Sequence, residues 1–184
     1  DLQQLNGASR EEFVSALRPL FNNETWPLEL AWESRPFGDV NELRAAIQVA
    51  VLTADDSRRA ALIHDYPAMD ELLLADADEA ATISADRGSL GLTDLDDVQT
   101  ERITELSAAY RERFDMPFVA YLDTNDTVDR VIDAGVRRLA NSPEQEYRTA
   151  LGEIVEIAND RFDILLADAN PVRSSWDRKF TEVD

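Results

Sequence analysis

The sequence contains no cysteine and only one histidine, His64. Without thiols the chain can have no disulfide framework, no thiolate nucleophile and no cysteine-based zinc site. A single histidine likewise excludes a histidine-rich metal site. The side chains left for chemistry are carboxylates, phenols, arginines and this one imidazole.

Lysine is almost absent as well, because Lys179 is the only one. The chain has 18 basic and 38 acidic residues, which gives a formal net charge of -20. Nucleic acids and anionic membranes bind surplus Lys and Arg, so this balance argues against both as partners. The excess of Asp over Glu favours a halophile, in which dense carboxylates keep a protein hydrated and salt screens their repulsion. An acidic protein from a mesophile is the other interpretation.

Long apolar runs are missing too: no stretch of about 18 apolar residues occurs, so we predict no membrane-spanning helix. The first residues do not show a basic segment followed by an apolar one, and we therefore expect no signal peptide. The expected location is the cytoplasm.

Glycine and proline are scarce, with six and seven among 184 residues, and helix-capping pairs recur along the chain. Ser9 with Glu12 and Asp39 with Glu42 are two such pairs. Together they predict an all-α fold, a single-domain helical bundle of about seven to nine helices over residues 1–170, followed by a C-terminal tail over 171–184. Expected helices cover about 10–22, a short stretch from Trp26, 40–51, 55–65, one that Thr93 or Asp94 caps, 124–141 and 143–168. Val98 and Val136 are expected on the apolar faces of two of them.

Residues 116–122 are the only β-like run, and we expect an extended segment there because no partner strand is evident. Polar and titratable groups gather instead between Leu62 and Leu92, beside residues that end helices. Tyr66 precedes Pro67 and must leave helical space. If the protein has a reactive site, we expect it to begin in this stretch.

Several short segments occur in a fixed order and spacing along the chain. They are Glu12-Phe13-Val14, Trp26, Ala31-Trp32 with Arg35-Pro36-Phe37, Leu62-Ile63 with Pro67, Gly91-Leu92, Ala109-Tyr110 with Arg113-Phe114 and Pro117-Phe118, Arg138-Leu139-Ala140-Asn141, and Ala150-Leu151-Gly152-Glu153-Ile154 with Ile157-Ala158 and Arg161. Together they resemble the 2-oxo-4-hydroxy-4-carboxy-5-ureidoimidazoline (OHCU) decarboxylase family, and the resemblance covers about residues 2–168.

The resemblance implies an all-α homodimer, without cofactor or metal, that converts the last intermediate of urate breakdown to (S)-allantoin. The family's catalytic His-Pro pair falls on Tyr66-Pro67, and its Glu-Gln pair falls on Asp86-Arg87. The resemblance thus implies Tyr66 and Asp86 as catalytic residues, both substituted relative to the family. The implied substrate-binding residues are Pro67, Ser84, Arg87, Phe118, Val119, Ala120, Tyr121, Leu122 and Arg161.

The chemistry of these groups leaves alternatives open. A tyrosine can donate a proton but is a poor base unless a cation lowers its pKa, and Arg87 or Arg161 could be that cation or clamp a carboxylate. Tyr66 could equally pack at a helix end, Asp86-Arg87 could be a surface ion pair, and Arg161 could lie along an apolar stripe. His64 is either a catalytic group or a solvated one. The protein is then either a decarboxylase acting on a small anionic heterocycle or an inactive relative serving as a binding scaffold.

Overall fold

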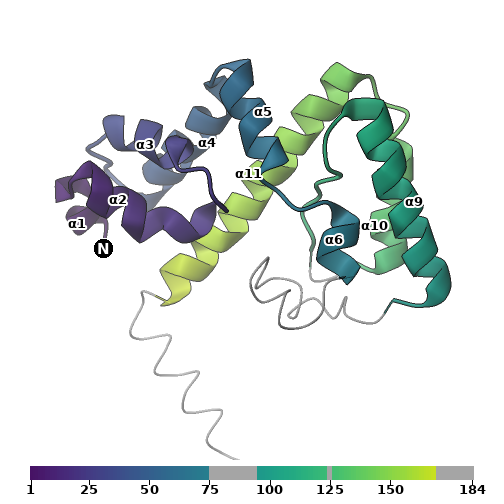
Figure 1. The fold of residues 1–184 in the computed structure, drawn as a ribbon. Helices are drawn as coiled ribbons and strands as arrows, with labels where there is room; N and C mark the ends of the chain where they lie inside the picture. The colour runs from purple at the N-terminus through teal and green to yellow at the C-terminus, as the bar shows by residue number, and fades with distance from the viewer. Residues whose placement is uncertain (75–94, 124–125, 169–184) are drawn as a thin grey trace, which may run out of the picture. The chain divides into compact units, whose positions relative to one another are not determined.

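The computed structural model describes residues 1–74, 95–123 and 126–168 of the chain. These residues form helices joined by short connections (Figure 1). In order along the chain they are α1 (Leu2–Gly7), α2 (Arg10–Leu17), the 3-10 helix η1 (Arg18–Leu20), α3 (Trp26–Glu33), α4 (Val40–Thr53), α5 (Asp56–His64), α6 (Met69–Leu74), α9 (Asp97–Phe114), α10 (Val128–Arg138) and α11 (Pro143–Asp168).

The predicted all-α fold is confirmed, since no strand occurs in the described residues. The β-like run is also as expected: residues 117–123 form neither helix nor strand. None of the described helices is long and apolar enough to cross a membrane.

Capping side chains fix several helix starts where the sequence predicts them. Ser9 Oγ accepts from the Glu12 amide at 3.2 Å, and the Glu12 carboxylate accepts from the Ser9 amide at 2.8 Å. Asp39 Oδ1 accepts from the Glu42 amide at 2.9 Å. Each contact satisfies an amide that the first helical turn leaves without a carbonyl partner. These short-range signals are therefore sufficient to begin α2 and α4.

Other boundaries and faces differ from the expectation. Helix α2 ends at Leu17 and becomes 3-10 at Arg18–Leu20, because Pro19 has no amide hydrogen to continue the helix. Helix α9 is capped by Asp96 and begins at Asp97, later than expected. Val98 and Val136 are 64% and 52% exposed. Helix α1 was not expected.

The described part of the chain divides into two compact units, residues 1–54 with 155–168, and the described residues between 55 and 154. In the first unit α3 packs on α2 and α4. The buried Phe13 and Phe37 rings stack there with centroids 6.3 Å apart. The C-terminal part of α11 contributes Phe162, which is buried. This unit therefore contains buried aromatic side chains from both its N-terminal and its C-terminal part.

The second unit, residues 55–154, is continuous in sequence. Helix α9 packs against α6 and α10, which flank it (Figure 1). Its core holds fully buried side chains from α5, α9 and the segment after α9. Tyr110 and Phe118 are among them.

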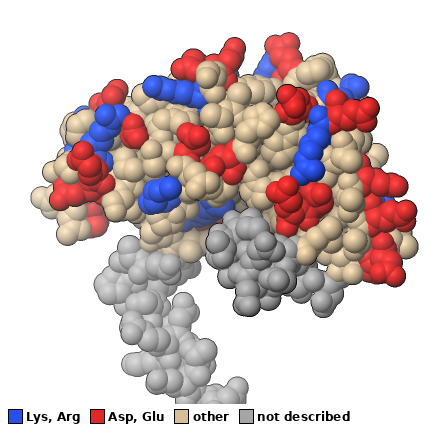
Figure 2. Space-filling model, in the orientation of Figure 1, with Lys and Arg blue, Asp and Glu red and all other residues tan. Residues whose placement is uncertain are grey.

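Charged side chains are scattered over the surface. On the face shown in Figure 2, acidic side chains are spread over the molecule with basic ones among them. Arg102, for example, lies between Asp129 and Asp133, with nitrogen–oxygen distances of 3.2 and 2.8 Å. Each exposed pair of this kind contributes little to the stability of the fold.

Candidate active site

The Tyr66-Pro67 pair lies immediately after α5. The Asp65 amide donates to Ala61 O at 3.1 Å, and the Tyr66 amide donates to Ile63 O at 3.2 Å. Pro67 then prevents a further helical turn. Tyr66 is turned inward and is only 6% exposed, whereas His64, the last residue of α5, is exposed. The structure therefore places a buried phenol at this junction and leaves the imidazole at the surface.

A second predicted element, the segment 116–123, begins at an unusual backbone position. Asp115 adopts the left-handed conformation, with φ of 52° and ψ of 39°, and its amide closes α9 on Arg111 O. This residue directs the chain out of the helix. Phe118 is then fully buried, with its ring 5.2 Å from that of Tyr110. The segment is anchored by this one aromatic side chain in the core of the second unit.

Close approach to α10 makes this anchoring possible. A β-carbon on Gly135 would lie 2.5 Å from Leu106 Cδ2 and 2.8 Å from Phe118 Cζ. These distances are far inside van der Waals contact, so only glycine leaves room for the Phe118 ring. Gly135 thus fixes how closely α10 packs on α9 and on the segment.

Arg138, at the end of α10, holds the backbone of the segment. Its Nη1 donates to Val119 O at 2.8 Å, and its Nε donates to Glu146 Oε1 at 2.8 Å. The guanidinium carbon lies 4.9 Å from the centre of the Phe118 ring. Arg138 therefore contacts the side chain of Phe118 and the main chain of Val119, which are neighbours in the segment.

The partners of Arg138 complete a buried cluster, which we call the Arg138 cluster: Arg138, Asn141, Glu146 and Glu153. Asn141 Nδ2 donates to Glu146 Oε2 at 2.8 Å. Glu153 Oε2 accepts from the Tyr121 amide at 2.9 Å, and its Oε1 lies 4.0 Å from Arg138 Nη1. The Glu146 side chain is fully buried and that of Arg138 is 11% exposed.

Burial changes the acidity of these groups. It raises the pKa of Glu146 to about 7, and the nearby Glu153 carboxylate adds to that rise. Burial also lowers the pKa of Arg138 to about 10, against the opposing effect of Glu153. The charged cluster is thus costly to desolvate and is held together by its mutual hydrogen bonds.

The predicted site residues fall into three groups: some lie in the second unit, one lies in the first unit, and the rest lie outside the described residues. Tyr66, Pro67 and residues 118–122 belong to the second unit, where Tyr66, Phe118 and Val119 are buried and the others partly so. Arg161 belongs to the first unit, and its Nη1 donates to Leu20 O at 3.3 Å and to Asn22 Oδ1 at 3.1 Å. Ser84, Asp86 and Arg87 lie outside the described residues, as does the tail 171–184.

Sequence reasoning did not assign a role to Arg138, Glu146 or Glu153. A signal existed for two of them, because Arg138 and Glu153 lie in segments that carry the family resemblance. Glu146 gave none, since an acidic residue in the first turn of a helix is usually solvated. Tyr110 is fully buried, and its hydroxyl has no hydrogen-bond partner within the described part of the chain.

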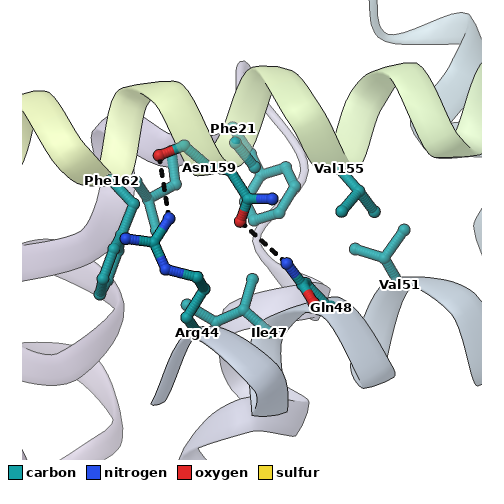
Figure 3. Close-up of a pocket in the computed structure, with 10 residues that line it drawn as sticks. Phe21, Arg44, Ile47, Gln48, Val51, Val155, Asn159 and Phe162 are labelled. Atoms are coloured by element: carbon teal, nitrogen blue, oxygen red, sulfur yellow. Dashed lines mark hydrogen bonds between the residues drawn. The ribbon is translucent and has the colours of Figure 1, made fainter. Parts of the chain in front are cut away.

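Two hollows in the first unit do not suit an anionic heterocycle. The cavity between α4 and α11 in Figure 3 has a volume of about 10 Å³, roughly that of one water. Gln48 Nε2 donates to Asn159 Oδ1 across it at 3.0 Å. A larger groove of about 630 Å³ beside α1 is lined by apolar residues with Asp1 and Glu12, and by no arginine or lysine. The first, although Arg44 lines it, is too small for a heterocycle, and the second offers no cationic side chain to a carboxylate.

The described residues contain no group of three or more His, Asp or Glu side chains arranged to hold a metal ion. The second unit holds the buried phenol of Tyr66 and also the Arg138 cluster, which binds the main chain of residues 119 and 121. These are groups that can orient a ligand and donate protons to it.

Comparison with solved structures places the fold in a known class. The structure of an (S)-allantoin synthase matches 89% of this chain with a TM-score of 0.67 and 22% sequence identity. The chain covers 53% of that protein, or about half its length. At this identity the match establishes the shared all-α fold.

The sequence comparisons identify the family. The OHCU decarboxylase family model matches residues 6–163. The 2-oxo-4-hydroxy-4-carboxy-5-ureidoimidazoline decarboxylase of Haloferax volcanii is 38% identical over 162 residues, covering 87% of this chain and 92% of the relative. The mouse (Mus musculus) protein of the same name is 33% identical over 180 residues, covering 94% and 97%. The chain therefore belongs to the OHCU decarboxylase family.

Proposed function

We propose that this protein is a cofactor-free decarboxylase that converts the ureidoimidazoline intermediate of urate breakdown to (S)-allantoin. The observation that carries the proposal is the family membership over residues 6–163. By the resemblance Tyr66 stands where the family has its catalytic histidine, and its buried phenol can donate a proton or a hydrogen bond. Tyr66 shares its compact unit with the anchored segment 118–122.

The reaction requires little from the protein beyond placement and one proton. The bond from the ring carbon to the carboxylate breaks, CO2 leaves, and the electron pair passes into the imidazoline ring of the substrate. A proton then adds to one face of that ring, which sets the product's handedness. Exclusion of water from the leaving carboxylate and fixed orientation of the ring supply most of the acceleration.

In this scheme Tyr66 donates the proton or hydrogen bond, and solvent later restores its phenol. Asp86 takes the second catalytic position. Ser84, Arg87 and Arg161, with Pro67 and residues 118–122, bind the substrate, with an arginine fork on a carboxylate or ureido oxygen. These assignments follow the resemblance residue by residue and form part of the proposal. His64 has no role in it, because its exposed position on α5 suits a solvated imidazole.

We further propose that the protein acts in the cytoplasm as a homodimer. A chain without cysteine suits a reducing compartment, and the family resemblance supplies the dimer. Sedimentation equilibrium should give twice the mass of 20.7 kDa. A monomer at micromolar concentration would contradict the dimer without touching the activity.

The activity is tested by generating the intermediate enzymatically from urate in solution. Circular dichroism then follows the handedness of the allantoin formed, with and without the protein. We expect one enantiomer to accumulate faster when the protein is present. Racemic product at the spontaneous rate, with no calorimetric binding of allantoin, would leave only a non-catalytic scaffold.

Tyr66 provides the sharper test of mechanism. Tyr66→Phe removes the hydroxyl and keeps the buried ring, so we expect the rate to fall by about 100-fold or more, as for loss of a general acid. Tyr66→His introduces the residue type of the family. Combined with Asp86→Glu, it should raise the rate of decarboxylation above that of the wild type. A Tyr66→Phe protein with full activity would remove tyrosine from the mechanism.

A further inference from the structure

Two side chains of the Arg138 cluster bind the backbone of the segment 118–122. Arg138 Nη1 binds Val119 O at 2.8 Å, and Glu153 Oε2 binds the Tyr121 amide at 2.9 Å. These two contacts bracket Ala120, which is partly exposed. Ala120 itself makes no main-chain hydrogen bond within the described ranges 1–74, 95–123 and 126–168. Its position is therefore set by the two anchors beside it.

The two anchors are themselves coupled. Arg138 and Glu153 lie 4.0 Å apart, and Arg138 is also fixed by the fully buried Glu146, which Asn141 holds from its other oxygen. The aromatic face of Phe118 packs against the guanidinium group. A displacement of either anchor would consequently move the main chain at 119–121 together with its aromatic neighbour.

Stability alone is a poor explanation for this arrangement. Replacing a buried charged network by apolar side chains of similar volume is often neutral or stabilising. The network also ends on main-chain atoms of a segment without regular structure, where no repeating hydrogen bonds would otherwise fix the backbone. Its distinctive effect is to define the position of two consecutive peptide groups.

We propose that Glu153 and Arg138 are positioning residues for the decarboxylation, holding the main chain of residues 119–121 in the geometry that receives the substrate ring. The inference rests on the proposed function, because it assigns the role of residues to the reaction proposed above. Glu146 and Asn141 orient Arg138, and none of the four needs to touch the substrate. Displacement of a binding surface by about 1 Å can cost on the order of 100-fold in rate.

Glu153 is the best residue to test, since its side chain is 30% exposed and its loss leaves no buried charge without water. Glu153→Ala removes the acceptor for the Tyr121 amide. Glu153→Gln keeps an oxygen acceptor and removes the charge. The matched control is Glu156→Ala, an exposed carboxylate on the same helix. Steady-state kcat and KM are measured for all four proteins by the circular dichroism assay, at a temperature where each is fully folded by thermal melting.

We expect Glu153→Ala to lose at least tenfold in kcat while remaining folded, Glu153→Gln to recover most of that loss, and Glu156→Ala to match wild type. Faster hydrogen exchange of the Tyr121 amide in Glu153→Ala would show that the anchor has been released. Recovery by glutamine separates the hydrogen bond from a general loss of stability.

Unchanged kcat and KM in Glu153→Ala would overturn the inference while the proposed function stands. An equal loss in Glu153→Gln and Glu153→Ala would also overturn it, since the retained acceptor would then have no effect. A wild-type protein with no activity and no binding of allantoin would remove the proposed function and the inference together. Arg138→Lys offers an independent check, because lysine keeps the charge but loses the fork, and it should lower kcat as well.

Discussion

Two arginines, one in each compact unit, form similar contacts in different surroundings. Arg44 in the first unit donates to Asn159 O at 3.3 Å and pairs with Asp163, whose side chain is 65% exposed. Arg138 in the second donates to Val119 O at 2.8 Å and pairs with the fully buried Glu146. Both also lie over a phenylalanine ring. Water can replace the partner of Arg44 but cannot reach the partner of Arg138.

The comparison indicates what each arginine contributes. Arg44 sits beside a cavity of about 10 Å³ and closes the packing of α4 on α11 (Figure 3). Arg138 fixes a segment with no regular structure. The first arrangement stabilises a helix pair that would pack through its apolar residues in any case. The second specifies a main-chain position that apolar packing alone would leave less defined.

The largest expected effect separates these two arginines. Arg138→Met should lower the free energy of unfolding by about 3–5 kcal/mol, because Glu146 is then left buried without its partner. Arg44→Met should cost about 1 kcal/mol, as expected for an exposed ion pair. Urea unfolding of both variants measures the difference. Equal losses would mean that burial of the partner does not distinguish the two sites.

Gly135 and Gly152 allow a second comparison, between a glycine in a crowded position and one in an open position. Gly135→Ala places a β-carbon 2.5 Å from Leu106 Cδ2, so overpacking should destabilise the protein by about 1–3 kcal/mol. Gly152→Ala meets nothing within 4 Å and should stabilise α11 by about 1 kcal/mol through helix propensity. Urea midpoints at constant slope report both changes. Stabilisation by Gly135→Ala would show that the Phe118 ring moves aside at little cost.

A third comparison concerns the acidity of Glu146. Its pKa is raised from 4.5 to about 7 by burial and by Glu153, so the folded state holds this proton more tightly than the unfolded state. The resulting stability is fully present below pH 4.5 and is lost as pH rises through 7. Arg138 and Asn141 are the other groups that face this carboxyl.

Glu146→Gln removes the titration. The free energy of unfolding of wild type minus that of the variant should therefore decrease between pH 4.5 and 7. Urea unfolding at several pH values measures it, with Glu156→Gln on the exposed side of α11 as control. A difference that increases with pH would show that the ion pair with Arg138 dominates over burial.

Local signals in the sequence predicted much of the fold. Ser9, Asp39 and Ser142 begin helices as expected because each cap bonds an amide three residues away. Such contacts need no information from the rest of the chain. Helix α2 ends at Leu17, before the expected end at about residue 22, because Pro19 stops the helix although the apolar periodicity continues.

Faces and pairings were harder to predict. Val98 and Val136 fit an apolar stripe, yet each is exposed, because a helix buries only as many turns as its neighbours cover. The buried pair of Arg138 and Glu146 depends on two helices meeting at the turn between them, which periodicity does not reveal. The role of the Arg138 cluster is visible only when its distances to residues 119 and 121 are known.

The sequence separations of these contacts have a consequence for folding. The contacts that hold the Arg138 cluster join residues 8, 19 and 32 positions apart. Those that close the first unit, Gln48 to Asn159 and Arg161 to Leu20, join residues 111 and 141 positions apart. Closing a longer loop costs more chain entropy and slows contact formation. During synthesis the contacts that hold residues 119 and 121 can therefore form before Gln48 meets Asn159 and before Leu20 meets Arg161.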